Sequence, residues 1–266
     1  MINKNVIADA YPLHRIDDQI DSMRGSAWFT TLDLTKGYHQ MNLDTSSCEY
    51  TAFTTPLGLY QWKVLPMGMK TSGAIFQRLM DSVLGDLQPK IAVVYIDDIT
   101  IFSPTLEQHY EDVNCVLERL SVANLKVNVN KCAFAREEVI VLGFKVSKDG
   151  INPNPAKVQG INDLQPPKNV SGVKRILGMF NFYQKFIPNF AMLADPIVEL
   201  TRGKMSKNSE IKWDQQHNKC LLILKNKFSL APILKYPKTH KRVCYRNGRL
   251  SSWSGSHANS RIRIRR

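Results

Sequence analysis

The sequence has few of the features that mark secreted or membrane proteins. Its longest unbroken run of aliphatic and aromatic residues covers residues 91–96, far short of the roughly 20 residues that a membrane span needs. Polar residues at positions 3–5 interrupt the start, so we expect no signal peptide. The five cysteines are odd in number and form no C-x-x-C pair, which argues against a disulfide framework or a thiolate zinc site. We therefore expect a reducing intracellular compartment, cytoplasm or nucleus, and no membrane partner.

Acidic residues are scarce in the last quarter of the chain. Residues 201–266 hold 17 Lys and Arg but only Glu210 and Asp214, a net charge of +15. Residues 1–200 hold 19 Lys and Arg and 21 Asp and Glu, a net charge of −2, so the overall +13 belongs to the end of the chain. A basic chain suggests a nucleic-acid partner, but that argument does not apply to the first 200 residues.

The composition, 43% hydrophobic and 22% charged, is that of a globular protein. Apolar spacing predicts helices over residues 15–25, 72–84, 109–120 and 171–186. Runs of β-prone residues predict one strand each over residues 28–34 and 139–146, and two strands each within 51–64 and 91–102. Four prolines within residues 152–167 predict irregular structure and a domain boundary, and no apolar period extends beyond residue 237.

Two Asp-Asp pairs occur, and their surroundings differ. With 15 Asp among 266 residues, chance alone gives about 0.8 such pairs. Asp17-Asp18 lies on the polar side of the first predicted helix, where a solvated face explains it. Asp97-Asp98 lies between two apolar β-prone runs, which predicts a β-hairpin with both carboxylates at its tip. Adjacent like charges in a poor turn sequence indicate a cation that offsets their repulsion, with a merely solvated turn as the alternative.

A third carboxylate belongs to the predicted strand 28–34. Asp33 interrupts an otherwise apolar, β-prone run, where an unpaired charge would be costly. If this strand lies beside the hairpin, three carboxylates meet at one end of a sheet and provide hard oxygen ligands for two Mg²⁺ ions. The alternative is that Asp33 simply initiates a turn before Lys36-Gly37.

Short motifs follow one another in a fixed order along the chain. They are FTTLDLTKGYHQ at residues 29–40, LPMGMK at 65–70 with AIFQ at 74–77, YIDD at 95–98, LKVN at 125–128 with KC at 131–132, VLGF at 141–144, ILG at 176–178, YQKF at 183–186 and PI at 196–197. In order and spacing this series resembles the reverse transcriptase of Gypsy-type LTR retrotransposon Pol polyproteins, over residues 1–236.

The resemblance implies an α+β fold, in which an antiparallel palm sheet packs on helices and is followed by a helical thumb. The implied domains are a palm with largely missing fingers over residues 1–150, a thumb over 151–205, the start of a connection or RNase H-like region over 206–237, and an unstructured basic tail over 238–266. It implies an RNA-directed DNA polymerase that extends a DNA primer on an RNA or DNA template with dNTPs. Two Mg²⁺ ions, or Mn²⁺, would be the cofactors.

The resemblance also assigns roles to charged residues. Asp33, Asp97 and Asp98 would hold the two ions, one of which would lower the pKa of the primer 3′-hydroxyl while the other neutralises the leaving pyrophosphate. Lys131 would be the general acid for the pyrophosphate, unless it is simply solvated.

Two segments would meet the nucleotide. The backbone amides of Lys36 and Gly37 would face the triphosphate, because small residues allow a close approach. The ring of Tyr38 would occupy the place of a ribose 2′-hydroxyl, although the residue alone would be taken for an ordinary half-buried tyrosine. Met67 and Gly68 would form the floor of the pocket.

Later segments would hold the primer and the duplex. Leu142, Gly143 and Phe144 would form a primer grip, although plain core strand residues would look the same. Residues 164–194 hold four Lys and Arg, no Asp or Glu, and several aromatic residues. This combination suits a duplex backbone, and the alternative is that the aromatics form helix core while the basic groups reach solvent.

The chain departs from the family at both ends. We expect the basic fingers segment that the family carries before Tyr11 to be largely missing, and residues 241–266 hold seven Arg and no acid, as a frame-shifted tail would. Gly73 replaces the usual Pro, and Tyr50 replaces a frequent Lys. Two other interpretations therefore stay open: a catalytically inactive remnant that at most binds nucleic acid, and an unrelated metal-dependent phosphoesterase with His39 as the nearby histidine.

Overall fold

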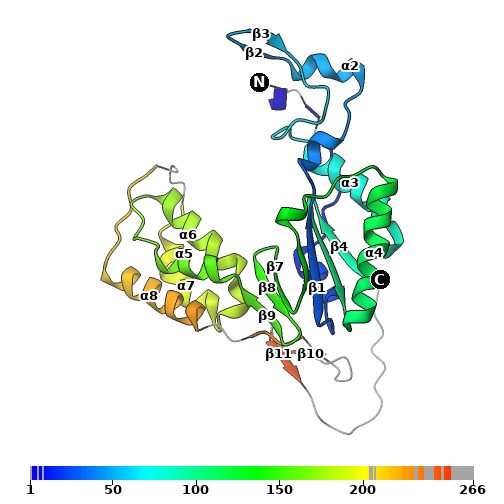
Figure 1. Cartoon of the computed structure of the whole chain (residues 1–266). Coiled ribbons are helices and arrows are strands. Elements are labelled where there is room, and N and C mark those ends of the chain that lie inside the picture. The colour runs from blue at the N-terminus through cyan, green and yellow to red at the C-terminus, as the bar shows by residue number, and fades with distance from the viewer. Residues whose placement is uncertain are drawn as a thin grey trace, which may run out of the picture.

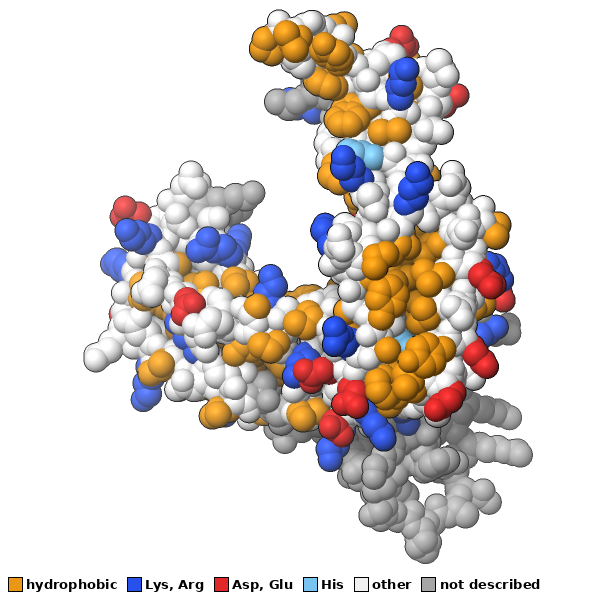
Figure 2. Space-filling view, viewed as in Figure 1, with side chains coloured by type: hydrophobic (Ala, Val, Ile, Leu, Met, Phe, Trp, Pro, Cys, Tyr) orange, Lys and Arg blue, Asp and Glu red, His pale blue; other side chains and the backbone are white. Residues whose placement is uncertain are grey.

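Three parts make up the computed structural model, which describes residues 2–4, 6–7, 9–203, 206, 208–230, 233–236, 243–246 and 249–252. A central sheet with its helices forms the body of the molecule, a helical lobe lies beside it, and an upper arm rises above the sheet (Figure 1). The space-filling view is hollowed between the upper arm and the helical lobe (Figure 2).

The central sheet has four antiparallel strands in the order β4-β5-β1-β6. The strands are β1 (Trp28–Asp33), β4 (Ala92–Tyr95), β5 (Asp98–Ser103) and β6 (Ala133–Arg136). β1 and β5 pair along their full length, from Trp28 opposite Ser103 to Asp33 opposite Asp98. The predicted strand 28–34 is thereby confirmed, and its β-branched and aromatic residues explain why it forms.

Side-chain alternation gives the central sheet two different faces. Leu32 and Ile99 point to one face and are buried with side chains of α3 and α4, whereas Phe29 and Phe102 point to the other and pack with α1 and the second sheet. The helices are α1 (Ile16–Ser22), α3 (Ser72–Leu84) and α4 (Leu106–Val122). All three confirm predicted helices.

A second antiparallel sheet, β7-β8-β9, joins the central sheet to the helical lobe. Its strands are β7 (Glu138–Val141), β8 (Phe144–Ser147) and β9 (Gly150–Pro153), and the lobe contains α5 (Pro155–Asn162), α6 (Val170–Phe182), α7 (Phe190–Glu199) and α8 (Gln215–Ser229). Phe144, Phe180 and Phe228 are buried in one apolar cluster with Phe29. The lobe and the central sheet therefore share a continuous core.

The upper arm carries exposed apolar side chains at its tip (Figure 2). Leu57 and Leu59, in and beside the β2–β3 hairpin, are 87% and 73% exposed. The arm consists of α2 (Thr45–Cys48), η3 (Glu49–Thr51), β2 (Phe53–Thr55) and β3 (Gly58–Tyr60). The remaining elements are η1 (Ile2–Lys4), η2 (Gly37–Gln40), η4 (Gly85–Leu87), η5 (Val129–Lys131), η6 (Gln184–Phe186), β10 (Val243–Arg246) and β11 (Arg249–Ser252).

The predicted β4–β5 hairpin forms, but its turn is displaced by one residue. Tyr95 pairs with Asp98, so the two turn residues are Ile96 and Asp97, and Asp98 is the first residue of β5. The expectation that both carboxylates lie in the turn was wrong. The buried residues of β4 and β5 set the register of the hairpin. This register puts Ile96 in the turn, where it adopts an unfavourable positive φ of 59°.

Three other predictions need correction. Residues 139–146 form two strands, because Leu142 and Gly143 adopt positive φ angles and make a tight turn. Residues 152–167 contain a helix, α5, which Pro155 begins at a position where proline is compatible with a helix. Residues 238–266 were expected to be unstructured, yet β10 and β11 form a hairpin there, and the rest of that segment lies outside the described residues. The predicted domain limits stay predictions.

Among the helices of the described ranges, none has the length and apolarity needed to cross a membrane.

Candidate active site

The end of β1 and the start of β5 bring two carboxylates together. Asp33 and Asp98 are direct partners in the β1–β5 ladder. The backbone of Asp33 bonds away from β5, because its N–H donates to Cys132 Sγ and its C=O accepts from the Asn128 N–H. Asp33 and Asp98 therefore form a non-hydrogen-bonded pair, in which Cα atoms lie about 4.5 Å apart and side chains are closest. Alternation places both carboxylates on the face opposite α3 and α4.

The adjacent turn places Asp97 beside this pair, and a buried glutamine supports the turn. The N–H of Ile96 donates to Gln77 Oε1 at 2.7 Å. Gln77, on α3, has no exposed surface, and its Nε2 donates to Asp81 Oδ1 at 2.9 Å and to the Val94 carbonyl at 3.3 Å. A left-handed β-branched residue is strained, and the hydrogen bond that Ile96 donates to Gln77 helps to hold it there.

The carboxylates repel one another in the folded chain. Partial loss of contact with water, together with the charges of Asp97 and Asp33, raises the pKa of Asp98. Burial and the charge of Asp97 raise the pKa of the Tyr38 hydroxyl. The charge of Asp97 therefore acts on the Tyr38 hydroxyl, which indicates that the η2 segment lies beside the carboxylates.

A cavity of about 130 Å³ borders the carboxylate pair. Asp33, Asp98 and Lys131 line it together with Ile140 and Val141 of β7. Lys131 Nζ lies 3.9 Å from Asp33 Oδ2, which is close enough for ionic attraction but too far for a hydrogen bond. The structure therefore brings Lys131 to the site, and its role as a general acid stays a prediction.

The donor set fits a hard divalent cation. Mg²⁺ prefers carboxylate oxygens, and a cation would offset both the burial and the like charges of Asp97 and Asp33 that raise the pKa of Asp98. The side chain of Asp33 is 41% exposed, so water and substrate oxygens can reach it. In the described part of the chain, no three His, Cys, Asp or Glu side chains are already gathered to hold an ion. Asp33 and Asp98 would therefore be the first ligands, and Asp97 or substrate oxygens would complete the set.

The η2 segment presents its residues beside α3. Lys36 adopts a left-handed conformation with φ 49°. A Cβ on Gly37 would lie 3.1 Å from Phe76 Cζ, so only glycine fits there without displacing the ring. The Tyr38 ring packs on Phe76 with centroids 5.2 Å apart. This packing fixes the orientation of the Tyr38 ring, and its role against a ribose 2′-hydroxyl stays a prediction.

The predicted floor of the pocket is a loop before α3. Met67 is 61% exposed, and Gly68 has φ 82° with its carbonyl accepting from Asn3 Nδ2 at 2.8 Å. Ser72 Oγ donates to the Pro66 carbonyl at 2.8 Å and fixes the loop to the helix. The loop is anchored and accessible, and its contact with a nucleotide stays a prediction.

The predicted primer grip is the β7–β8 turn. The Gly143 carbonyl accepts from Tyr183 Oη at 2.9 Å and from the Asn154 N–H at 3.1 Å. Phe144 is 2% exposed and stacks on Phe182. A primer contact from this turn would therefore come from Leu142 and the backbone, because Phe144 belongs to the core.

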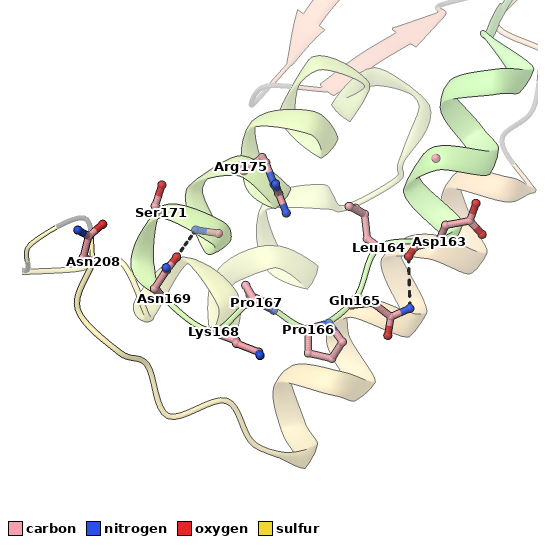
Figure 3. A pocket seen from close by; sticks show the side chains of 12 residues that line it. Asp163, Leu164, Gln165, Pro166, Pro167, Lys168, Asn169, Ser171, Arg175 and Asn208 are labelled. Atoms are coloured by element: carbon pink, nitrogen blue, oxygen red, sulfur yellow. Dashed lines mark hydrogen bonds between the residues drawn. The ribbon is translucent and has the colours of Figure 1, made fainter.

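The helical lobe has a cavity of about 630 Å³ at the start of α6 (Figure 3). Lys168 and Arg175 line it, and the Asn169 side chain accepts from the Gly172 N–H at 2.8 Å. Both cations come from the segment for which the sequence predicts duplex contact. The cavity is lined by the lobe alone, so it is separate from the carboxylate site.

The sequence left two alternatives for residues 164–194, contact with a duplex or a helix core with solvated basic groups. Its other charged and aromatic residues support each alternative in part. Phe180 and Phe186 are buried, as the core alternative predicts, whereas Phe182 is 42% exposed. Lys185 Nζ lies 2.7 Å from Asp17 Oδ1, so this cation is occupied within the chain. Asp17 is exposed on α1, as the sequence predicts for the Asp17-Asp18 pair.

Sequence reasoning missed the residues that hold the carboxylates in place. Gln77 lies next to Phe76 and one turn before Met80 on the buried side of α3, and a polar residue on an apolar helix face was the available signal. Cys132 is part of a sequence motif, but periodicity says nothing about a thiol that bonds to a strand end.

Comparison with known proteins identifies the family. The model described as "Reverse transcriptase (RNA-dependent DNA polymerase)" matches residues 1–146. The Pol polyprotein of transposon opus from Drosophila melanogaster is 41% identical over 215 residues, which are 79% of this chain and 21% of that polyprotein. That of transposon gypsy, from the same organism, is 36% identical over 248 residues, 90% of this chain and 24% of the polyprotein. The chain thus spans less than a quarter of the length of these relatives.

Solved structures show the same fold. The foamy viral protease-reverse transcriptase in complex with dsDNA matches 91% of this chain and 50% of its own with a TM-score of 0.80 and 26% identity. The same viral protein in complex with an RNA/DNA hybrid matches 90% of this chain and 32% of its own, with a TM-score of 0.79 and 26% identity. By family model, curated relatives and fold, the chain belongs to the reverse transcriptase (RNA-dependent DNA polymerase) family.

Proposed function

We propose that the chain is the polymerase part of a retroelement Pol polyprotein and catalyses RNA-directed DNA synthesis. The primer 3′-hydroxyl oxygen attacks the α-phosphorus of a dNTP, a new P–O bond forms, and the bond to the β-phosphate oxygen breaks to release pyrophosphate. The observation that carries the proposal is the β1–β5 register, which places Asp33 beside Asp98 at the open end of the sheet.

The carboxylates would hold two Mg²⁺ ions, or Mn²⁺, through Asp33, Asp97 and Asp98. Ions held there supply Lewis-acid activation of the primer hydroxyl and neutralise charge on the pyrophosphate. Lys131 lines the same cavity, and it would be the general acid that protonates the leaving pyrophosphate. Tyr38, fixed on Phe76, would exclude a ribose 2′-hydroxyl by its bulk.

The partners would be an RNA or DNA template, a DNA primer and dNTPs. Support comes from the two solved structures of the foamy viral protein, one in complex with dsDNA and one with an RNA/DNA hybrid. The hollow between the upper arm and the helical lobe (Figure 2) lies beside the central sheet, as the same view in Figure 1 shows. Lys168 and Arg175 on the lobe provide cations for a phosphate backbone.

Primer extension on an RNA template, with and without Mg²⁺, tests the proposal. Asp98→Asn keeps the side-chain shape but removes an ionic ligand, so we expect at least a hundredfold loss of extension with an unchanged circular dichroism spectrum. Asp18→Asn is the matched control, since Asp18 is 69% exposed on α1, and it should be fully active. Extension by Asp98→Asn within tenfold of the wild type would refute the assignment. A wild-type chain that binds Mn²⁺ but extends no primer would instead be an inactive remnant.

A further inference from the structure

We infer that Cys132 is a positioning residue for Asp33, and that its thiol replaces a missing strand partner at the end of β1. The inference rests on the proposed function of Asp33 as a metal ligand. It concerns the backbone of Asp33 and not its carboxylate, which the thiol does not touch.

On the side away from β5, the pairing of β1 is interrupted at Asp33 and resumes only as an isolated bridge between Leu34 and Val127. β6 pairs with β1 at Phe29 and Thr31, with an irregular register between them, and it begins only at Ala133, opposite Thr31. The preceding residues, Val129–Lys131, form the 3₁₀ helix η5. No β6 carbonyl therefore stands opposite the Asp33 N–H, which faces away from β5. A backbone donor without a partner at this place would weaken the end of the strand.

The thiol of Cys132 closes the gap. Asp33 N–H donates to Cys132 Sγ at 3.4 Å, and the Cys132 S–H donates to the Asn128 carbonyl at 3.2 Å. The N–H of Asn128 in turn donates to the Asp33 carbonyl at 2.8 Å. Both main-chain groups of Asp33 are thus tied to one five-residue segment, Asn128 to Cys132, and the sulfur works as acceptor and donor at once.

This arrangement controls the direction of the Asp33 side chain. Backbone dihedrals at a strand end set where Cβ points, and a displacement of about 1 Å in a reactive group can cost a hundredfold in rate. Partners that orient metal ligands contribute to metal affinity even though they do not touch the ion. The same segment carries Lys131, so a loosened segment would also shift the cation that lies 3.9 Å from Asp33.

Three variants separate the hydrogen bonds from the volume of the side chain. Cys132→Ala removes acceptor and donor. Cys132→Ser keeps both, at a slightly shorter reach. Cys115→Ala is the matched control, because Cys115 is likewise partly buried against the core that α3 and α4 form with the sheet.

The full 266-residue chain is used, with two readouts. Amide hydrogen exchange of the metal-free protein should quicken about threefold to tenfold at Asp33 in Cys132→Ala, the effect of one lost hydrogen bond. The Kd for Mn²⁺, measured by electron paramagnetic resonance, should rise by about tenfold. Cys132→Ser should restore most of both values, and Cys115→Ala should match the wild type.

The outcomes distinguish the inference from the function on which it rests. If Mn²⁺ binds and Asp33→Asn abolishes binding, but Cys132→Ala and Cys115→Ala behave alike in both readouts, the inference is wrong. If Cys132→Ser is as impaired as Cys132→Ala, side-chain hydrogen bonding is not the cause, and the inference is also wrong. If the wild type has no Asp33-dependent Mn²⁺ site, the proposed function fails instead, whatever the exchange rates are.

Discussion

Asp98→Asn should make the metal-free protein more stable while it removes metal binding. Burial raises the pKa of Asp98, and the like charges of Asp97 in the turn and Asp33 across the ladder raise it further. An acid whose pKa is raised on folding destabilises the folded state above that pKa, and the penalty disappears below the unfolded pKa of about 3.9. At pH 7 the substitution therefore removes a penalty that water and salt only partly screen.

The size of the effect follows from the exposure of the site. Like charges directly opposite one another in a sheet cost a few tenths to about 1 kcal/mol per pair. With two neighbours and partial access of water, we expect a gain of about 1 kcal/mol, which raises Tm by about 2–4 °C in a protein of 150–250 residues. In Mg²⁺ the wild type should instead be more stable than Asp98→Asn, because an ion at 100 times its Kd stabilises the protein that binds it by about 2.7 kcal/mol.

Thermal unfolding followed by circular dichroism, in EDTA and in Mg²⁺, measures both effects. The variant should melt above the wild type in EDTA at pH 7, with a difference that shrinks as the pH falls towards 4, and below it in saturating Mg²⁺. Asp18→Asn, on an exposed helix face, should change stability by less than about 0.5 kcal/mol in either buffer. A variant that is less stable than the wild type in EDTA would show that the carboxylates do not repel one another, and the argument for a cation would fail.

Three other changes test separate parts of the structure. Gln77→Ala should cost about 2–4 kcal/mol in urea unfolding, because it leaves the Ile96 N–H without its acceptor and opens a cavity; a loss below 0.5 kcal/mol would contradict the role of this bond in the turn. Tyr38→Ala should lower the preference for dNTP over rNTP in single-nucleotide extension, and an unchanged preference would place the ring outside the pocket. Deletion of residues 238–266 removes nine Lys and Arg and no acid, so the dependence of nucleic-acid affinity on log salt should become shallower, and an equal slope would mean that these charges do not contact the duplex.

The sequence was most informative where one local rule decides the structure. The helix predicted over residues 72–84 has those limits in the structure, because its apolar positions repeat at helical spacing and Gly85 ends it with a positive φ. The strand that ends at Asp33 was equally clear from its β-branched and aromatic residues. In both cases propensity, spacing and burial favour the same structure, so tertiary contacts do not change what the local sequence prefers.

Sequence reasoning failed where a tertiary contact outweighs a local preference. Ile96 is a poor residue for a left-handed turn, and it is found there because the β4–β5 register and Gln77 leave no other position for the turn. Leu142 takes the same conformation in the β7–β8 turn, where Tyr183 holds the Gly143 carbonyl. Neither bond is visible in periodicity, since the partners are 19 and 40 residues apart in sequence.

The four aspartates near the α3–β4 region show what separates a ligand from a structural group. Asp81 accepts hydrogen bonds from Tyr11, His14, Gln77 and Gln88, and although burial opposes the effect, these bonds lower its pKa. A carboxylate whose lone pairs are filled in this way has little left to give a cation.

The three proposed ligands differ from Asp81 because they are held by their backbones and not by hydrogen bonds to their carboxylates. Asp98 is fixed by its backbone pairing with β4, Asp97 by the turn that Gln77 supports, and Asp33 by the segment that ends in Cys132. Among the described residues, no hydrogen bond reaches the carboxylate oxygens of these three, and the nearest cation, Lys131, stays 3.9 Å away. Carboxylate oxygens that accept no hydrogen bond keep all their lone pairs available to an ion, so these three ligands are held firmly and yet are free to bind one. Fixing each aspartate through the main chain achieves both, and the mutual repulsion that results is the cost that a divalent cation would remove.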